Sequence, residues 1–112
     1  MNKKYRLRKR RDFNYTYKKG RSLANSCLVL VYRKNNLGVS RFGFSISKKF
    51  GKAVQRNKIK RRLREICRLR LDKIKTGYDL IFIARVGARD ANFQKLENQV
   101  ENLLKRSGLF KE

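Results

Sequence analysis

The stretch that decides the fold lies at residues 48–64 and reads KKFGKAVQRNKIKRRLR. Nine of its 17 residues are Lys or Arg, and none is Asp or Glu. From Val54 onward the apolar residues recur with helical spacing, and at about 100° per residue they share one stripe. They are Ile59, Leu63, Ile66 and Cys67. The pattern predicts a basic helix over residues 54–71 that packs this stripe on a core.

The opposite face of the predicted helix is cationic. Asn57, Arg61, Arg64 and Arg68 gather there, with Lys58 and Arg62 on a flank. An ordinary solvated face would carry mixed-sign pairs at i, i+4, but here like charges stand together and repel. Gly51 lets the backbone turn sharply before the helix, whose free N–H groups add positive dipole character. Polyanionic phosphate is the chemical complement of such a face.

These residues also resemble a known family. The ungapped run from Ser45 to Arg61 is similar to the signature of the bacterial ribonuclease P protein subunit, whose helix carries an Arg-Asn-Arg core followed by Ile-Lys-Arg. Lys58 stands where the family more often has its second Arg, which keeps the charge but loses planar bidentate recognition of phosphate. The resemblance extends over residues 11–110. It implies that the basic stretch docks on a catalytic RNA through Lys48, Lys49, Lys52, Arg56, Asn57, Lys58, Lys60, Arg61, Arg62, Arg64 and Arg68.

Charge is distributed unevenly along the 112 residues, which have a formal net charge of +24. Residues 1–64 hold 22 basic groups and a single acid, Asp12, whereas the remainder holds ten basic and seven acidic groups. Nucleic acid is the leading partner for such a chain. A membrane partner is disfavoured because no basic helix carries a wide apolar aromatic face. Polyvalent anions are expected to stabilise the free protein, since they relieve repulsion in the folded state.

Catalytic groups are not evident in the chain. There is no His, and the eight carboxylates are scattered without a paired or metal-ligating cluster. A Gly-rich phosphate loop and a nucleophile elbow are also missing. Cys27 and Cys67 lie among apolar neighbours and are interpreted as small buried hydrophobes rather than as a disulfide or metal pair. We therefore expect no catalytic residue and no stably bound metal in this protein; the resemblance implies an RNA catalyst with Mg²⁺ at its own active site.

The N-terminal third predicts an arm followed by a helix. Residues 1–11 carry seven Lys or Arg, so they are expected to be extended or mobile, either as an arm that settles on RNA or as a solubilising tail. Asp12 is predicted to cap a helix that runs to Lys19 and closes at Gly20. Phe13 and Tyr17, four residues apart, either pack into the core or form a stacking surface for unpaired bases. The resemblance implies the second, in a cleft that takes the 5′ leader of precursor tRNA.

Strands are predicted at residues 26–33, 39–47 and 78–84. The turn-rich residues 34–38 are expected to close a hairpin between the first two. Ser45 and Ser47 lie on the small polar side of the second strand, which either floors an RNA groove or simply faces solvent. The family tends to place a third leader-facing aromatic near Val31; Tyr32 is the neighbouring candidate, although a one-residue offset turns a side chain to the other face. The expected leader cleft therefore comprises Phe13, Tyr17, Tyr32, Ser45 and Ser47.

A last amphipathic helix is predicted with Phe93, Leu96, Val100, Leu103 and Leu104 on its apolar face, ending at Gly108. The chain is thus expected to be one RNA-binding domain over residues 1–112, of α+β class. Its predicted order is α-β-β-β-α-β-α, with helices backing a small mixed sheet of about four strands. The resemblance implies the rare left-handed form of the strand–helix–strand crossover.

In function, the resemblance implies the protein component of ribonuclease P, a tRNA 5′ endoribonuclease whose partners are the catalytic RNA and precursor tRNA. The alternative is a ribosomal or RNA-chaperone protein that binds structured RNA without a linked reaction; a DNA-binding architectural protein is a third candidate. No apolar run approaches the ~20 residues that cross a bilayer, and the N-terminus lacks the apolar core of a signal peptide, so a cytoplasmic location is expected.

Overall fold

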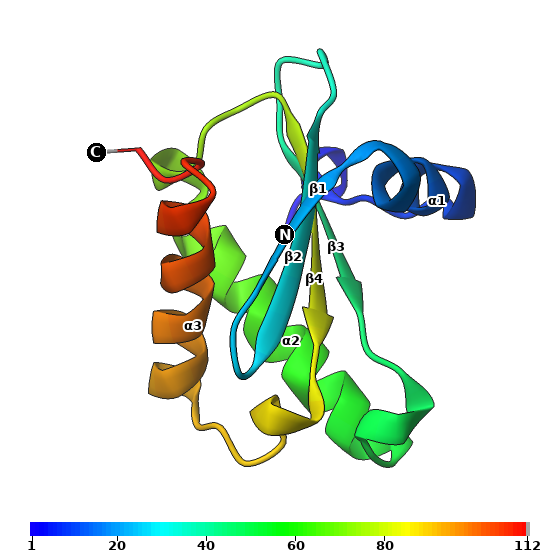
Figure 1. Ribbon diagram of the computed structural model, residues 1–112, viewed down its shortest axis with the longest axis vertical. Helices are drawn as coiled ribbons and strands as arrows, with labels where there is room; N and C mark the ends of the chain where they lie inside the picture. The colour runs from blue at the N-terminus through cyan, green and yellow to red at the C-terminus, as the bar shows by residue number, and fades with distance from the viewer. Residues whose placement is uncertain (112) are drawn as a thin grey trace.

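The computed structural model describes residues 1–111, and its elements follow the predicted order α-β-β-β-α-β-α (Figure 1). The elements are α1 (Arg10–Lys19), β1 (Arg21–Ala24), β2 (Leu28–Lys34), β3 (Arg41–Ser45), α2 (Ala53–Leu69), β4 (Tyr78–Ala84) and α3 (Phe93–Arg106). The strands form one sheet in the order β1-β2-β4-β3; β3 and β4 run parallel and the other neighbours antiparallel. Helices α2 and α3 cover one face of the sheet and α1 lies against the other (Figure 1). The predicted α+β class with a four-stranded mixed sheet is confirmed.

Strand β4 has the bounds predicted from the sequence and is an interior strand of the sheet. Leu80 and Phe82 belong to the core beneath α2 and α3, whereas Ile81 belongs to a smaller cluster on the α1 side. All three side chains are fully buried. Because both faces of β4 are covered, its sequence does not alternate between apolar and polar residues.

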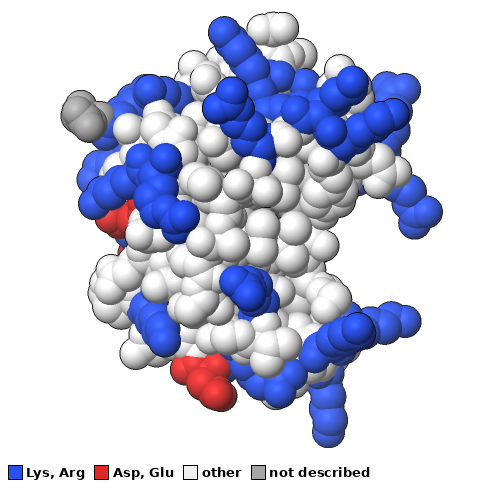
Figure 2. All heavy atoms as spheres, in the orientation of Figure 1, with Lys and Arg blue, Asp and Glu red and all other residues white. Residues whose placement is uncertain are grey.

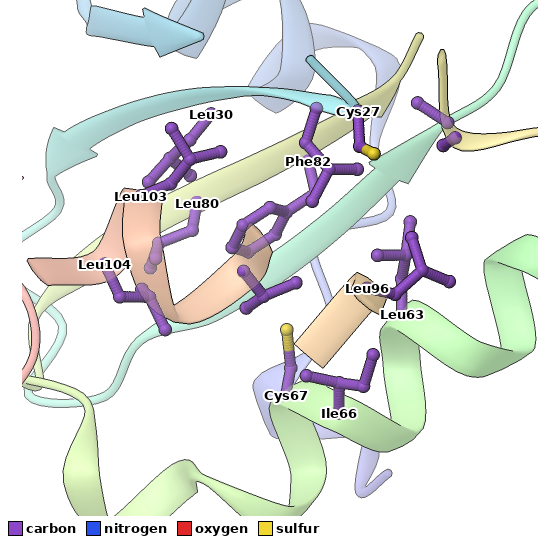
Figure 3. Close-up of a cluster of buried hydrophobic side chains, with 14 of the residues drawn as sticks. Cys27, Leu30, Leu63, Ile66, Cys67, Leu80, Phe82, Leu96, Leu103 and Leu104 are labelled. Atoms are coloured by element: carbon purple, nitrogen blue, oxygen red, sulfur yellow. The ribbon is translucent and has the colours of Figure 1, made fainter. Parts of the chain in front are cut away.

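The main core joins the sheet to α2 and α3 (Figure 3). Leu63, Ile66 and Cys67 of α2 face the sheet together with Ile59, as the helical spacing predicted. Helix α3 contributes Leu96, Val100, Leu103 and Leu104, all fully buried. The burial of these two stripes leaves the polar side of α2 directed away from the core.

The hairpin predicted at residues 34–38 is wrong in its pairing. The turn forms, with Asn36 and Gly38 at φ of 62° and 75°. However, β4 lies between β2 and β3, and it pairs with β2 from Leu28↔Ala84 to Lys34↔Tyr78. Turn residues determine where the chain reverses, but the most apolar strand takes the position that is covered on both faces.

Several element boundaries also differ from the prediction. The strands expected at residues 26–33 and 39–47 span Leu28–Lys34 and Arg41–Ser45, and the basic helix ends at Leu69. The predicted order required a third strand before the basic helix but gave it no position; it is β1. This short edge strand exposes three of its four residues, so it lacks the apolar alternation by which strands are found.

Strand β3, helix α2 and strand β4 form a parallel crossover, and its hand is left (Figure 1). Nearly all such connections are right-handed, so the resemblance rather than the general rule gave the right expectation. The start of α2 lies beside the end of β3, where Ser45, Arg56 and Asn57 line one pocket. The crossover therefore joins the basic helix to the edge of the sheet.

Helix α1 begins earlier than predicted, and Asp12 is not its N-cap. The helix starts at Arg10 after Lys9, and Asp12 lies in its first turn, where the carboxylate faces Arg41. Gly20 follows the helix but has φ of −82°, so it is not a left-handed cap. Position 20 requires glycine for steric reasons, because a Cβ there would lie 2.5 Å from the Thr16 carbonyl oxygen.

The N-terminal arm is attached to the sheet, and its backbone is extended at Arg6, one of the two expected states. Arg6 forms a parallel bridge with Phe42 of β3, and the Leu7 N–H donates to the Phe42 carbonyl at 2.9 Å. The Leu7 side chain is buried in the small cluster with Val31 and Ile81. The only apolar side chain in the run 6–11 thus anchors the arm on the edge of β3.

Asp79 of β4 is a fully buried carboxylate at the centre of an ion-pair network. It accepts hydrogen bonds from Arg41 Nε at 2.9 Å, Arg41 Nη2 at 2.8 Å and Asn35 Nδ2 at 2.9 Å. Arg33 Nη2 lies 3.3 Å from its second oxygen. The hydrogen bonds to Asp79 raise the pKa of Arg41, against the opposing effect of desolvation. A buried charge that is paired in this way is costly to leave without its partner.

No helix within residues 1–111 combines the length and the apolar character needed to span a bilayer.

We predict that Asp79→Asn destabilises the protein by about 3 kcal/mol, because it leaves two guanidinium groups without their buried counterion. The matched control is Glu65→Gln, which changes net charge equally but removes an exposed pair with Arg68. Urea unfolding measures both; the control should barely change the free energy of unfolding. Equal losses in the two variants would contradict the assignment of Asp79 as the central buried counterion.

Both cysteines are fully buried and unpaired, as predicted, and burial raises the pKa of the Cys67 thiol. The thiol therefore stays neutral in the folded state at a pH where an unfolded cysteine, with a pKa of about 8.5, ionises. We expect folding stability to fall as pH rises above that value, and to fall less in Cys67→Val, which lacks the titrating group. Thiol labelling at pH 8 should require unfolding. Rapid labelling of native protein would contradict the burial.

Candidate nucleic-acid interface

Helix α2 presents the predicted cationic surface. Its buried stripe faces the sheet, so the remaining positions are directed to solvent. Asn57, Lys58, Lys60, Arg61 and Arg68 are exposed, and Arg56, Arg62 and Arg64 are half-buried. Lys48, Lys49 and Lys52, ahead of the helix, are exposed as well. The expected RNA-binding residues are therefore brought together on one helix and the segment that leads into it.

Most of these cations have no acidic partner in the part of the chain that the structure describes. Within residues 1–111, Arg68 is the one member of the set that forms an ion pair, with Glu65, where Arg68 Nε lies 2.9 Å from Glu65 Oε2. Arg56 Nη1 donates to the Gly51 carbonyl at 2.7 Å, and Arg62 Nη1 reaches the Ala91 carbonyl at 3.4 Å. The remaining cations of the set have no ion-pair partner among the described residues, and clustered cations of this kind favour a polyanionic ligand.

Gly51 has a different role from the sharp turn that the sequence suggested. Its φ is 160°, an extended conformation, but a Cβ there would lie 2.1 Å from Gln55 Oε1. That oxygen accepts a hydrogen bond from the Lys52 N–H at 2.9 Å and satisfies one free donor at the helix start. The glycine therefore makes room for a cap on α2.

A cationic cavity joins the arm to α2, and sequence reasoning missed half of it. The cavity has a volume of about 420 Å³ and lies at the edge of β3. Arg6 and Arg8 of the arm face Lys60 and Arg64 of α2 across it, with Phe13, Phe42, Gly43 and Phe44 among its other lining residues. Arg6 Nε is buried and has no hydrogen-bond partner within residues 1–111. The arm was recognised as basic, but only the bridge to β3 places its cations beside α2.

On the opposite face of the sheet, α1 borders the predicted aromatic cleft. The Phe13 and Tyr17 rings lie 6.2 Å apart. Phe13 packs on Val31 and Ile81, beside the partly buried Val29 and Ile83, whereas Tyr17 is 41% exposed. Figure 2 shows a hollow of uncharged atoms between α1 and the segment before α2, with Lys and Arg on both rims. Phe13 thus packs partly into the small core, whereas Tyr17 is open to solvent; the base-stacking role of the pair stays a prediction.

Ser45, at the end of β3, lies beside the basic helix. It is half-buried and lines a pocket of about 310 Å³ with Phe44, Ile46, Arg56, Asn57 and Lys60. Ser47 lies two residues further on and is exposed at the entrance to a short 3₁₀ turn.

Tyr32 is not part of the cleft, which corrects its predicted place. It packs against the core beneath α2 and α3, whereas Val31 belongs to the cluster around Phe13. Neighbouring residues of a strand point to opposite faces, and the register that pairs Tyr32 with Leu80 fixes its side. The position that the family tends to fill with a third aromatic is therefore aliphatic in this protein.

Arg85 and Arg89 donate hydrogen bonds to backbone carbonyls of the protein itself. Arg85 Nη1 donates to the Asn25 carbonyl at 2.7 Å. Arg89 donates to the carbonyls of Phe50 and Lys49 at 2.8 and 3.1 Å, which holds the lysine-rich segment before α2. No group of three His, Cys, Asp or Glu side chains lies close enough to hold a metal ion in the part of the chain that the structure describes.

Comparison with known proteins gives a consistent answer. The family model described as Ribonuclease P matches residues 1–108. The chain is 45% identical over 109 residues to a ribonuclease P protein component of Clostridium botulinum, covering 96% of this chain and 98% of that protein. A relative of the same description from Clostridioides difficile is 47% identical over 104 residues, with 92% and 91% covered.

Solved structures agree with this. An RNase P protein from Staphylococcus aureus superposes with a TM-score of 0.89 at 41% identity, covering 96% of this chain and 98% of that one. The Thermotoga maritima protein gives 0.84 at 42% identity, covering 90% and 96%.

We predict that sulfate raises the melting temperature of the free protein more than chloride at matched ionic strength, because a polyvalent anion binds the folded state at clustered cations. Arg64→Gln should reduce the sulfate effect, since Arg64 lines the cationic cavity. The control is Lys95→Gln, which makes the same change of charge at an exposed position of α3. A melting temperature indifferent to the anion would contradict the prediction.

Proposed function

Because this chain belongs to the ribonuclease P protein family, we propose that it binds the catalytic RNA of ribonuclease P through α2 and the 5′ leader of precursor tRNA through the cleft beside α1. The observation that carries the proposal is the pairing of two different surfaces on one small domain. One is a helix whose cations, Arg68 apart, have no ion-pair partner within residues 1–111, and the other is an aromatic and aliphatic hollow with cationic rims.

The two surfaces suit two kinds of contact. Phosphates of a folded RNA are bound by fixed Lys and Arg side chains irrespective of sequence. A single-stranded leader instead offers unstacked bases, which aromatic side chains hold by their π-faces. Ser45, with Arg56 and Asn57 in the same pocket, lies where the two surfaces meet, so one molecule can hold the catalyst and its substrate together.

The bond-breaking step belongs to the RNA in this proposal. Cleavage of the 5′ leader is a metal-dependent hydrolysis, with Mg²⁺ held at the RNA active site and no group of this chain in the reaction. The role of the protein is to lower the electrostatic repulsion between the two RNAs. Its cations neutralise phosphates where two RNAs approach each other, so less Mg²⁺ is needed to overcome their repulsion.

The direct test adds the purified chain to a ribonuclease P RNA and precursor tRNA at low Mg²⁺. We expect 5′ cleavage to increase markedly and the Mg²⁺ requirement to fall. Absence of any gain, with the protein bound to the RNA, would leave a structural RNA-binding protein as the better description.

We expect Tyr17→Ala to weaken binding of leader-bearing precursor tRNA by about 1–3 kcal/mol if one base stacks there, and to leave binding of mature tRNA unchanged. Tyr17 is exposed, so the truncation does not open the core. Tyr17→Phe keeps the ring and should retain the affinity. Fluorescence titration against both RNAs, in the presence of the catalytic RNA, measures the difference. Equal weakening for both RNAs would remove Tyr17 from the leader site.

We expect Arg61→Gln to lower affinity for the catalytic RNA and to reduce the slope of log K against log salt by about one phosphate contact. Arg61 is exposed on α2, and Lys95→Gln on α3 is the matched loss of one exposed cation. Filter binding between 50 and 200 mM salt gives both slopes. A control slope that fell as far as that of Arg61→Gln would show that net charge, rather than the α2 face, determines binding.

A further inference from the structure

Helix α1 carries the two aromatic side chains of the proposed leader site, yet it has little apolar attachment to the sheet. Thr16 is its only fully buried residue, and that side chain is polar: its Oγ1 donates to the Asp12 carbonyl within the helix. Phe13 is partly buried, and Tyr15 and Tyr17 are 49% and 41% exposed. Apolar packing is not directional, so one half-buried ring does not fix the orientation of a ten-residue helix.

Polar contacts supply the missing constraint. Arg41 of β3 holds Asp79 of β4 through Nε and Nη2 at 2.9 and 2.8 Å, and its remaining Nη1 lies 3.5 Å from Asp12 Oδ2 on α1. A planar guanidinium that is fixed on two sides by a buried carboxylate presents its third nitrogen in a set direction. Arg41 thus links a rigid strand to the first turn of α1.

A second link runs along the same helix. Arg33 of β2 also lies 3.3 Å from Asp79, and its guanidinium carbon lies 4.4 Å from the centre of the Tyr15 ring. The Arg41 link and the Arg33 link both start from one buried carboxylate and reach α1 at Asp12 and Tyr15. Two attachment points define the direction of a helix axis, which a single point cannot.

With α1 held in this way, its packing against β3 is tight at Phe13. A Cβ on Gly43 would lie 2.5 Å from Phe13 Cζ, so the ring rests directly on the backbone of β3, one residue from Phe42 and two from Arg41. A small shift of α1 would lift this ring from its seat and change the width of the hollow between α1 and the sheet.

We propose that Arg41 is a positioning residue for the leader site: through Asp12 it holds α1, and with it Phe13 and Tyr17, at the spacing that accepts an extended single strand. The inference rests on the proposed function, because it concerns the same leader site. It assigns the ion-pair network a role in substrate binding besides its contribution to stability.

Asp12→Asn separates positioning from electrostatics, because the two effects change the affinity for leader-bearing RNA in opposite directions. The substitution removes a negative charge, so attraction alone predicts equal or tighter binding of any RNA. If Asp12 positions α1, leader-bearing precursor tRNA binds about 2- to 5-fold more weakly relative to leaderless tRNA, the range of a partly exposed ion pair. The buried Asp79 keeps all its partners in this variant, so the fold is retained. Arg41→Lys, which keeps the charge but loses the fork, should cause a larger loss in the same ratio.

The experiment measures the affinity ratio of leader-bearing to leaderless tRNA for the protein assembled with the catalytic RNA. Glu65→Gln is the control with the same chemistry and charge change on α2, and Gly43→Ala, which displaces Phe13 directly, is the positive control. In the free proteins, proton NMR gives an independent readout, because the Phe13 ring shifts the Gly43 Hα signals. We expect Asp12→Asn to lower the ratio and reduce this shift, and Glu65→Gln to change neither.

Two results would be decisive against parts of this account. If wild-type protein discriminates for the leader and Asp12→Asn discriminates equally well, the positioning role is wrong while the proposed function stands. If wild-type protein shows no preference for the leader, the leader site itself fails.

Discussion

The structure depends on the burial of one apolar stripe beneath a surface of like charges. Four side chains of α2, from Ile59 to Cys67, hold that helix on the sheet. The opposite side keeps its cations at fixed positions, and within residues 1–111 only Arg68 among them has an acidic partner. Hydrophobic burial does not depend on salt in the way that repulsion between exposed charges does. The core therefore supports an arrangement that is electrostatically unfavourable in the absence of a polyanion.

This arrangement explains why the two faces of the sheet differ so strongly. The face beneath α2 and α3 carries the main core and supplies most of the stability, including the fully buried Leu80 and Phe82. The face beneath α1 carries a small cluster and an ion-pair network around Asp79. Because α1 does not cover that face completely, an aromatic and aliphatic surface stays accessible beside the basic helix. In the proposed function, one face of the sheet stabilises the fold and the other receives the substrate.

The arm shows how local composition can hide a structural role. Its charge alone is typical of a mobile segment, and nothing around Leu7 suggests a strand. The open edge of β3 supplies the missing partner, because unpaired backbone groups on an edge accept another extended segment. Once Arg6 and Leu7 pair there, Arg6 and Arg8 are brought opposite Lys60 and Arg64. This cationic cavity collects cations that are more than fifty positions apart in the sequence, and it depends on the bridge between Arg6 and Phe42, which are 36 positions apart.

The sequence by itself determined the elements whose signal is periodic and local: the stripe of α2, the continuous apolar run of β4 and the apolar face of α3. It also predicted a polyanionic partner, since a run of like charges on one helix face is visible without coordinates. The tertiary structure decided which strands are neighbours, and so it overturned the hairpin between β2 and β3. It also places the Tyr32 side chain on the face of the sheet away from the cleft. Asp12 does not cap α1 as predicted, and its carboxylate lies beside Arg41 instead. The physical reason is the same in each case: helical and strand periodicity come from bonds between near neighbours, whereas sheet order, register and ion pairing are settled by competition among distant segments for the same buried positions.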